Sequence, residues 1–473
     1  MAVANGTPPV ETMSHLTESH IKDSSSKPQL KDLDASHVTI TKTSTLRPVP
    51  EPNSKEVWGS KSCSDHMISV KWTVDQGWHA PEIKPYGPLT MMPTASCLHY
   101  ATQCFEGMKV YRGFDGKLRL FRPERNCNRL VMSAQRVVLP AFDPVELEKL
   151  LKLFLGLDGP RWLPKSRPGS FLYVRPAIIG NGEELGVTAP SEVLLFVIAV
   201  PWPDLAGTPP GAAPKPPGLK LLASKEDTRA WPGGFGYAKV GANYGPSFVP
   251  QMEGRKLGYD QILWLFGPDY QVTEAGASNF FVVIRNKTTS ALELITAPTT
   301  DKIILDGVTR RSVLDLAQSR LTANSPYLSS SENKTPITPL EIVERTYSML
   351  EIEDAQKEGR LVEAFTSGTA VCVSQLCFVL SFLPPLPSPE IPPLALHRHK
   401  KEKKKKKIWR PPTNTTQYFV TPVSAINFRE QEIDIPMSEG DSGLYAKIIK
   451  GWLYDIMYGN VQHEWGVVID EDE

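Results

Sequence analysis

The feature that most constrains the fold is a stretch dense in proline and glycine at residues 201–218, PWPDLAGTPPGAAPKPPG. Proline fixes φ and lacks a backbone N–H, so this stretch continues neither a helix nor a central strand. Sequence typical of globular cores lies before it from about residue 46 and after it from residue 219. We therefore predict a smaller N-terminal domain, 46–201, a connector, 202–218, and a larger C-terminal domain, 219–473.

Two further segments show no apolar periodicity and are predicted to lie outside both cores. Residues 1–45 are rich in Ser, Thr, Lys and Asp, which predicts a flexible tail. Residues 375–420 contain closely spaced prolines and then the basic run 400–407, which predicts a disordered insertion. A basic run can also bind anions or serve as a nuclear address, and a misassigned exon boundary would produce the same pattern.

Composition and charge exclude several classes of protein. Hydrophobic residues make up 41% of the chain and charged residues 22%, as in ordinary globular proteins. Lysine plus arginine equals aspartate plus glutamate at 52 each, which favours neither nucleic acid nor an anionic membrane as a partner. The six cysteines have no zinc-site spacing, so no metal is expected. An acidic N-terminal region without arginine before Arg47 fits neither a secretory nor a mitochondrial signal, and a cytoplasmic location is expected.

Local patterns predict alternating helices and strands, and hence a mixed α/β fold. Apolar residues at helical spacing follow Asp143 and Pro144, which suit an N-cap and a first helical position. Helices are also predicted to begin near Pro123 and after Gly307. Apolar runs at 171–179 and 193–200 have the length of strands, and hairpins are predicted over 261–274 and 279–296.

The segment most informative about chemistry is 229–246, RAWPGGFGYAKVGANYGP. Its glycines let the backbone pass close to a bound group. Lys239 is the single lysine in this segment and has aromatic neighbours. A buried lysine loses its charge readily, and a neutral amine can attack an aldehyde to form a Schiff base. The spacing alone is a weak signal, since most lysines beside glycines are merely exposed.

The chain resembles the eukaryotic branched-chain amino acid aminotransferases of fold-type IV. The resemblance rests on segments that occur in the family's order between about residues 58 and 467: Asp65-His-Met, LHYATQCFEGMK at 98–109, Leu120-Phe-Arg-Pro, Tyr173-Val-Arg-Pro, KVGANYGP at 239–246, Thr273-Glu-Ala-Gly, Ser367-Gly-Thr-Ala and His463-Glu-Trp. It implies a two-domain enzyme with pyridoxal 5'-phosphate held between the domains.

The resemblance also implies the residues that hold the cofactor. Lys239 corresponds to the lysine that forms the Schiff base and shuttles a proton. Glu274 corresponds to the acid opposite the pyridine nitrogen, and Tyr244 to the tyrosine beside the phenolic oxygen. The phosphate would be held by Arg129, Val308, Thr309 and Thr369. Without the resemblance, these residues have ordinary alternatives, such as a surface acid, a core tyrosine or a solvated arginine.

Substrate recognition is implied in the same way. Tyr100, Phe105 and Tyr173 would form an apolar wall, Arg175 would bind the second carboxylate of glutamate, and Ala370 would offer a backbone amide to the α-carboxylate. The loop 180–187 reaches the neighbouring subunit in the family, which implies a homodimer. The implied reaction transfers the amino group of leucine, isoleucine or valine to 2-oxoglutarate. Alternatives are a D-amino-acid transaminase, an aminodeoxychorismate lyase or a non-catalytic relative that binds the cofactor.

The chain departs from the family pattern at three further places, and the first two leave the preferred side chain open. Cys63 and Ser64 stand where relatives have an aromatic residue before the Asp65-His-Met stretch. The connector segment 209–213 lacks the aromatic residue that closes over substrate. Cys372 has no partner at the CxxC spacing of the animal mitochondrial enzymes, so their thiol switch is not expected.

Overall fold

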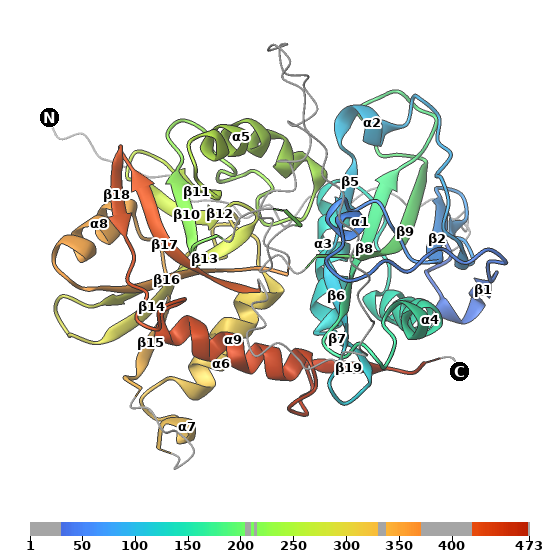
Figure 1. Cartoon of the computed structure of the whole chain (residues 1–473). Helices are drawn as coiled ribbons and strands as arrows, with labels where there is room; N and C mark the ends of the chain where they lie inside the picture. The colour runs from blue at the N-terminus through green and yellow to red at the C-terminus, as the bar shows by residue number, and fades with distance from the viewer. Residues whose placement is uncertain (1–29, 204–209, 212–214, 330–336, 370–418, 472–473) are drawn as a thin grey trace, which may run out of the picture.

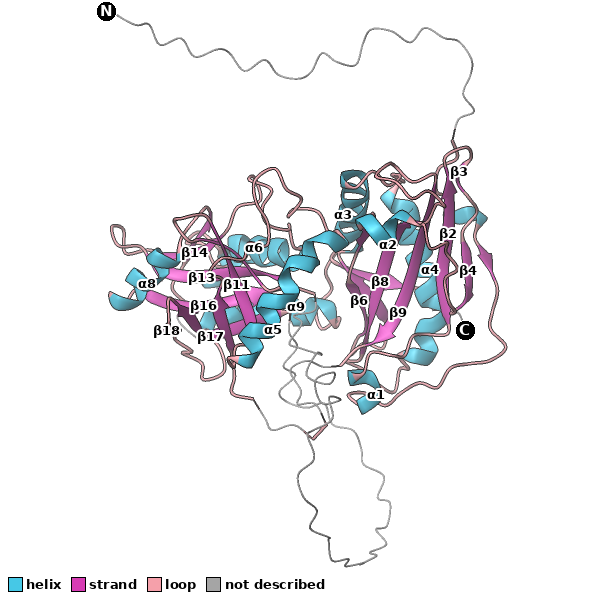
Figure 2. Cartoon of the chain, turned by 90° about the horizontal axis from the view of Figure 1, so that it is seen from above, coloured by secondary structure: helices cyan, strands magenta, loops and turns pink. Residues whose placement is uncertain are grey.

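The computed structural model describes residues 30–203, 210–211, 215–329, 337–369 and 419–471 (Figure 1). The described chain forms two lobes, each built on one large sheet with helices packed against it (Figures 1 and 2). This architecture confirms the mixed α/β prediction. None of the helices in the described ranges is both long and apolar enough to cross a bilayer.

The sheet of the first lobe is largely antiparallel. Along its edge-to-edge order the strands are β1 (Thr39–Ile40), β4 (Glu82–Pro85), β2 (His66–Thr73), β9 (Glu192–Pro201), β8 (Phe171–Gly180), β6 (Met108–Arg112), β7 (Leu118–Phe121) and β19 (Gly466–Ile469), with β3 (Gly77–Trp78) beside β2 and β5 (Gln103–Phe105) beside β8. Its helices are η1 (Ala35–His37), α1 (Lys55–Trp58), α2 (Ser96–Tyr100), α3 (Pro123–Arg136) and α4 (Pro144–Trp162).

The sheet of the second lobe nearly closes on itself, because β12 pairs with both β11 and β13. Its order is β12 (Gln271–Ala275), β11 (Gln261–Phe266), β10 (Leu219–Ala223), β17 (Val420–Phe428), β16 (Leu361–Ser367), β13 (Ser278–Arg285), β14 (Leu292–Thr296) and β15 (Leu340–Glu344), with β18 (Gln431–Asp434) beside β17. The helices are η2 (Gly241–Ser247), α5 (Phe248–Lys256), α6 (Val308–Arg320), α7 (Pro326–Ser329), α8 (Met349–Lys357) and α9 (Leu444–Met457).

Several local predictions are confirmed by these elements. The side chain of Asp143 accepts a hydrogen bond from the N–H of Val145 and caps α4, which continues to Trp162. Both predicted hairpins form, as the antiparallel pairs β11–β12 and β13–β14. A helix begins at Val308, directly after Gly307. These features depend on residues close together in the chain, which is why the sequence alone predicts them.

The predicted flexible tail is wrong for residues 30–45. Leu33 and Ala35 belong to the core of the first lobe, and β1 pairs with β4. The backbone N–H of Ala35 also donates to the Glu146 carboxylate at 2.8 Å. Two apolar residues are too few to create a detectable period, yet burying them is enough to dock the segment.

Two other predicted boundaries differ from the structure. The sequence predicts residues 466–469 in the second domain, but β19 pairs with β7 in the sheet of the first lobe, beyond the end of α9 (Figure 1). It predicts Phe419 and Val420 in the insertion, but both are buried and Val420 pairs with Ser367. The remaining residues of that insertion, to 418, lie outside the described residues. The division into two separately folding domains stays a prediction.

A buried carboxyl group links β16 to the start of α9. Glu363 accepts hydrogen bonds from the backbone N–H groups of Tyr445 at 2.9 Å and Ala446 at 2.8 Å. Burial raises its pKa from 4.5 to about 7, although the two N–H groups act in the opposite direction. The folded protein therefore holds this proton over a pH range in which the unfolded chain has released it.

We expect Glu363→Gln to flatten the dependence of stability on pH. Because the folded pKa lies above the unfolded one, the wild type loses stability as pH rises from about 4.5 to 7, and an amide cannot titrate. The unfolding free energy of the wild type should fall between pH 4.5 and pH 8 by roughly 3 kcal/mol more than that of the variant. Urea denaturation at several pH values measures this difference, and parallel curves would contradict the assignment.

Candidate active site

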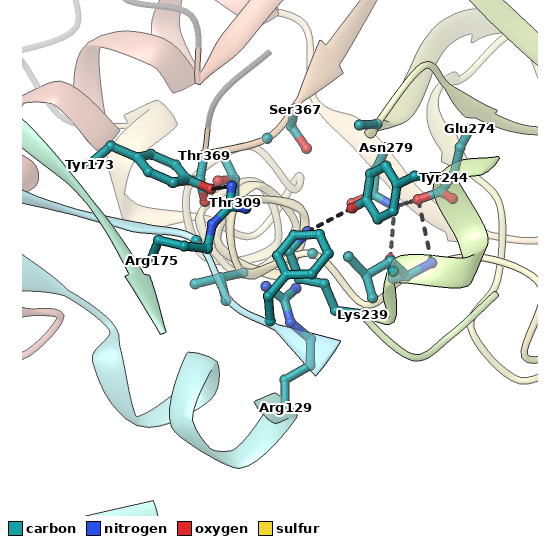
Figure 3. A pocket seen from close by; sticks show the side chains of 18 of the residues that line it. Arg129, Tyr173, Arg175, Lys239, Tyr244, Glu274, Asn279, Thr309, Ser367 and Thr369 are labelled. Carbon is teal, nitrogen blue, oxygen red and sulfur yellow. Dashed lines mark hydrogen bonds between the residues drawn. The ribbon is translucent and has the colours of Figure 1, made fainter. Parts of the chain in front are cut away.

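A cavity of about 350 Å³ lies between the two lobes (Figure 3). It is bordered by ten of the residues that the sequence singled out: Phe105, Arg129, Tyr173, Arg175, Lys239, Tyr244, Glu274, Val308, Thr309 and Thr369. They come from β5, α3, β8, the segment around η2, β12, the start of α6 and the turn after β16. The fold thus gathers residues that lie far apart in the sequence into one site.

Two predicted substrate residues are not placed at this cavity. Tyr100 lies at the end of α2 with its side chain exposed, beside the ring of His99 at 6.0 Å between centroids. Tyr100 does not border the cavity of the single chain, and its role in the apolar wall stays a prediction. Ala370 lies outside the described residues.

Lys239 is fixed through its backbone on both sides. Its N–H donates to the hydroxyl of Ser133 on α3 at 2.8 Å, and its carbonyl accepts from the N–H of Phe105 at 3.0 Å. Its amine lies 3.2 Å from the Tyr244 hydroxyl and 5.0 Å from the centre of the Phe105 ring (Figure 3). Three residues before Lys239, the backbone of Gly236 passes close to that of Ile303. A Cβ on Gly236 would meet the carbonyl oxygen of Ile303 at 2.0 Å, so the close contact of these two segments requires glycine.

Glu274 is a buried acid at the end of β12. One of its oxygens accepts from the Asn279 amide at 3.2 Å and from the N–H of Leu305 at 3.4 Å, and the other contacts the guanidinium of Arg229. Burial raises the pKa of Glu274, and the charge of Arg229 only partly offsets this. A second cation on the cavity side would therefore stabilise the ionised carboxylate.

Another part of the cavity is suited to an anion. Helix α6 begins there, and its N-cap residue, Gly307, provides no side-chain cap for the first N–H groups. Arg129 lies alongside and donates from Nη1 to the carbonyl of Asp306 at 2.8 Å. The hydroxyl of Ser367 is buried at this edge and has no hydrogen-bond partner among the described residues. Thr369 follows in the same turn.

The remaining wall combines aromatic rings with a cation. Arg175 donates from Nη2 to the Tyr173 hydroxyl at 2.8 Å, and its guanidinium lies 4.6 Å from the centre of the Phe105 ring. Trp202 lies against Tyr173 with 5.1 Å between ring centroids. A Cβ on Gly107 would meet the Tyr173 hydroxyl at 1.9 Å, so glycine is needed to leave Tyr173 in place.

Sequence reasoning assigned no role to four residues that shape this site: Glu106, Trp202, Arg229 and Asn279. Trp202 lies at the start of the connector, whereas the aromatic residue of the family pattern is expected in segment 209–213. An aromatic residue within a proline-rich connector was the available signal. No local sequence pattern marks Glu106 or Asn279. Glu106 acts through Arg129, which is distant in the chain, and Asn279 contacts Glu274 across the pair of strands β12 and β13.

Comparison with known proteins assigns the chain to a family. Residues 103–330 match the model for class IV amino-transferases. The mitochondrial branched-chain-amino-acid aminotransferase of Schizosaccharomyces pombe is 37% identical over 92% of this chain and 86% of its own length. The cytosolic enzyme of Saccharomyces cerevisiae is 37% identical over 93% of this chain and 99% of its own length.

Solved structures agree in fold. The Escherichia coli branched-chain amino acid aminotransferase has a TM-score of 0.54 and 20% identity, over 84% of this chain and 98% of its own. The enzyme of Thermoproteus uzoniensis has a TM-score of 0.55 and 19% identity, over 85% and 99%. The structures support the fold, and the identity to the two yeast proteins over more than nine tenths of the chain shows that it belongs to the branched-chain-amino-acid aminotransferase family.

Proposed function

We propose that the chain transfers the amino group of L-leucine, L-isoleucine or L-valine to 2-oxoglutarate, with pyridoxal 5'-phosphate as cofactor. The observation that carries this proposal is the cavity itself, which brings an amine, Lys239, and a buried acid, Glu274, together with an anion site at the start of α6. Another solved branched-chain amino acid aminotransferase of the same fold has been crystallised with pyridoxamine 5'-phosphate.

The residues present fit this cofactor. The N–H groups at the start of α6, Arg129 and the buried hydroxyl of Ser367 suit its phosphate. Glu274 suits the nitrogen of its ring, because a protonated nitrogen would supply a second cation beside Arg229 to this buried acid. When bound, the cofactor supplies an aldehyde that takes up the amino group and a ring that withdraws electrons from the substrate's Cα.

Lys239 is proposed to act as the base and acid of the reaction. Its amine Nζ would take the proton from the substrate's Cα and deliver it to the cofactor carbon that bore the aldehyde. The fixed backbone position of Lys239 and the nearby Tyr244 hydroxyl both support this role. The negative charge of Glu274 would keep a proton on the ring nitrogen. Arg229 and Asn279 hold the Glu274 carboxylate in position.

The substrate is proposed to lie between the aromatic wall and Arg175. Phe105, Tyr173 and Trp202 offer an apolar surface to a branched side chain. Arg175 can bind the second carboxylate of glutamate. Its hydrogen bond to Tyr173 and its position over the Phe105 ring orient the guanidinium for this role.

We expect Arg175→Met to separate the two half-reactions. The variant should lower kcat/KM for glutamate and 2-oxoglutarate by about 100-fold, since a charge-assisted contact is lost, and leave kcat/KM for leucine within a few-fold. Single-turnover rates with glutamate and with leucine measure the two effects separately. Equal losses for both substrates would exclude a role specific to the second carboxylate.

The direct test of the reaction is amino-donor profiling of the purified protein. Leucine, isoleucine and valine should each yield the matching 2-oxo acid in the presence of 2-oxoglutarate. Activity on D-alanine without activity on L-leucine would favour a D-amino-acid transaminase. Bound cofactor without turnover of any donor would favour a non-catalytic relative.

A homodimer is also proposed. Four exposed apolar side chains lie on α2 and on the loop after β8: Leu98, Tyr100, Leu185 and Val187, the last of them 84% exposed. The two segments approach each other at Gly180, against which Ser96 lies. Exposed apolar clusters of this kind often mark protein interfaces. A second copy of the chain would cover the loop 180–187 and Tyr100 together.

We expect Val187→Asp to shift the protein from dimer to monomer, because a buried unpaired charge would oppose the contact. Light scattering after size-exclusion chromatography measures the mass. Val145→Asp is the matched control, as Val145 is also exposed but lies at the start of α4, away from α2 (Figure 1). A wild type that elutes as a monomer at micromolar concentration would refute the dimer.

The cytoplasmic location remains a prediction. The related yeast proteins include a cytosolic and a mitochondrial form, so family membership does not decide between them. A fluorescent fusion at the C-terminus, expressed in the native cell, would locate the protein.

A further inference from the structure

Glu106 is the most completely enclosed acid beside the cavity. It follows β5 directly and its side chain is fully buried. Its carboxylate accepts from Arg129 twice, from Nε at 2.6 Å and from Nη2 at 2.9 Å, from the amide of Asn126 at 2.8 Å, and from the N–H of Gly107 at 3.0 Å. Although burial opposes its charge, the charge and hydrogen bonds of Arg129 prevail and lower the pKa of Glu106. The group is therefore an anion at neutral pH.

This contact fixes the orientation of the Arg129 guanidinium. Glu106 occupies the edge formed by Nε and Nη2, and the carbonyl of Asp306 accepts from Nη1. Within the described residues, three of the five N–H groups of Arg129 are thus engaged, which leaves one on each terminal nitrogen. Asp306 directly precedes Gly307, the N-cap of α6, so the guanidinium is tied to the start of that helix.

The charge of Glu106 and its contact with Arg129 have opposite expected effects on the affinity of the site for a phosphate. A carboxylate close to an anion site weakens the binding of a phosphate by repulsion. A carboxylate that holds an arginine in one rotamer strengthens it, because the long side chain need not be ordered when the anion binds. Four hydrogen bonds to one buried carboxylate indicate a rigid support.

We propose that Glu106 is a positioning residue for the cofactor's phosphate: it holds Arg129 so that the two remaining N–H groups of the guanidinium meet the phosphate at the start of α6. The proposal rests on the proposed function, since it takes the anion to be that of pyridoxal 5'-phosphate. Glu106 itself does not touch the phosphate, and its effect passes through Arg129.

The test compares the binding of pyridoxal 5'-phosphate with that of pyridoxal, which lacks the phosphate. Both are titrated into cofactor-free protein and followed by absorbance and by quenching of tryptophan fluorescence. In Glu106→Gln, the preference for the phosphorylated form should fall by about 10- to 100-fold, while the affinity for pyridoxal changes by less than about threefold. Tighter binding of pyridoxal 5'-phosphate in this variant would overturn the proposal.

Glu106→Asp separates position from charge and covers the case in which Glu106→Gln does not fold. The shorter side chain keeps the negative charge but cannot reach both Arg129 nitrogens, so the same selective loss is expected. An unchanged preference in Glu106→Asp would overturn the proposal. In an Arg129→Met background, Glu106→Asp should have no further effect on the preference, and an additive loss would show that Glu106 acts by another route.

Glu363→Gln is the matched control, because it changes a buried glutamate that does not border the cavity. It should leave the preference for the phosphorylated form unchanged, and an equal loss in this variant would overturn the proposal by showing a general effect of buried amides. A wild type that binds the two forms equally would instead contradict the proposed cofactor.

Discussion

Lys239→Ala is expected to abolish covalent attachment of the cofactor and to lower the transamination rate by about 10³-fold or more. The variant removes the amine that both reacts with the aldehyde and carries the proton from the substrate's Cα, and general acid–base catalysis alone accounts for about 10² to 10⁴-fold. Among the described residues, Lys239 is the only lysine that borders the cavity, so no neighbouring amine can replace it.

The measurement has two readouts. After borohydride reduction, mass spectrometry should find the cofactor attached to residue 239 in the wild type and no attachment in the variant. Single-turnover kinetics with L-leucine give the loss in rate. Lys225→Ala is the control, because the side chain of this lysine is 70% exposed and does not border the cavity. Covalent attachment that survives in Lys239→Ala would refute the assignment of the catalytic amine.

Glu274→Gln is expected to lower kcat by about 100-fold or more while the cofactor remains bound. An amide carries no charge, so it cannot hold a proton on the ring nitrogen, and the ring then withdraws electrons less strongly. The change also leaves the buried guanidinium of Arg229 without its counter-ion, which is expected to destabilise the site by several kcal/mol.

These two consequences can be distinguished. A double variant with Arg229→Met and Glu274→Gln removes both charges, so stability should recover in part while kcat stays low. Glu293→Gln, on strand β14 of the same sheet, is the control for a glutamate outside the cavity. Normal turnover in Glu274→Gln, with stability equal to that of the wild type, would exclude the proposed role of this acid.

Features that depend on neighbouring residues could be predicted from the order of amino acids alone. The cap at Asp143, the two hairpins and the start of α6 after Gly307 follow from turn chemistry and periodicity within short windows. The glycines around Lys239 marked a close approach of backbone, and the ordered motifs that resemble the family singled out ten residues that now border one cavity.

Contacts between groups far apart in the chain became visible only in the folded molecule. Glu106 and Arg129 are 23 positions apart and Arg229 and Glu274 are 45 apart, and each pair forms because packing brings two elements together. The docking of residues 30–45 and the return of β19 to the first sheet likewise depend on a surface that exists only after folding. Local patterns carry no information on such contacts, since the free energy that fixes them comes from burial shared between segments far apart in the chain.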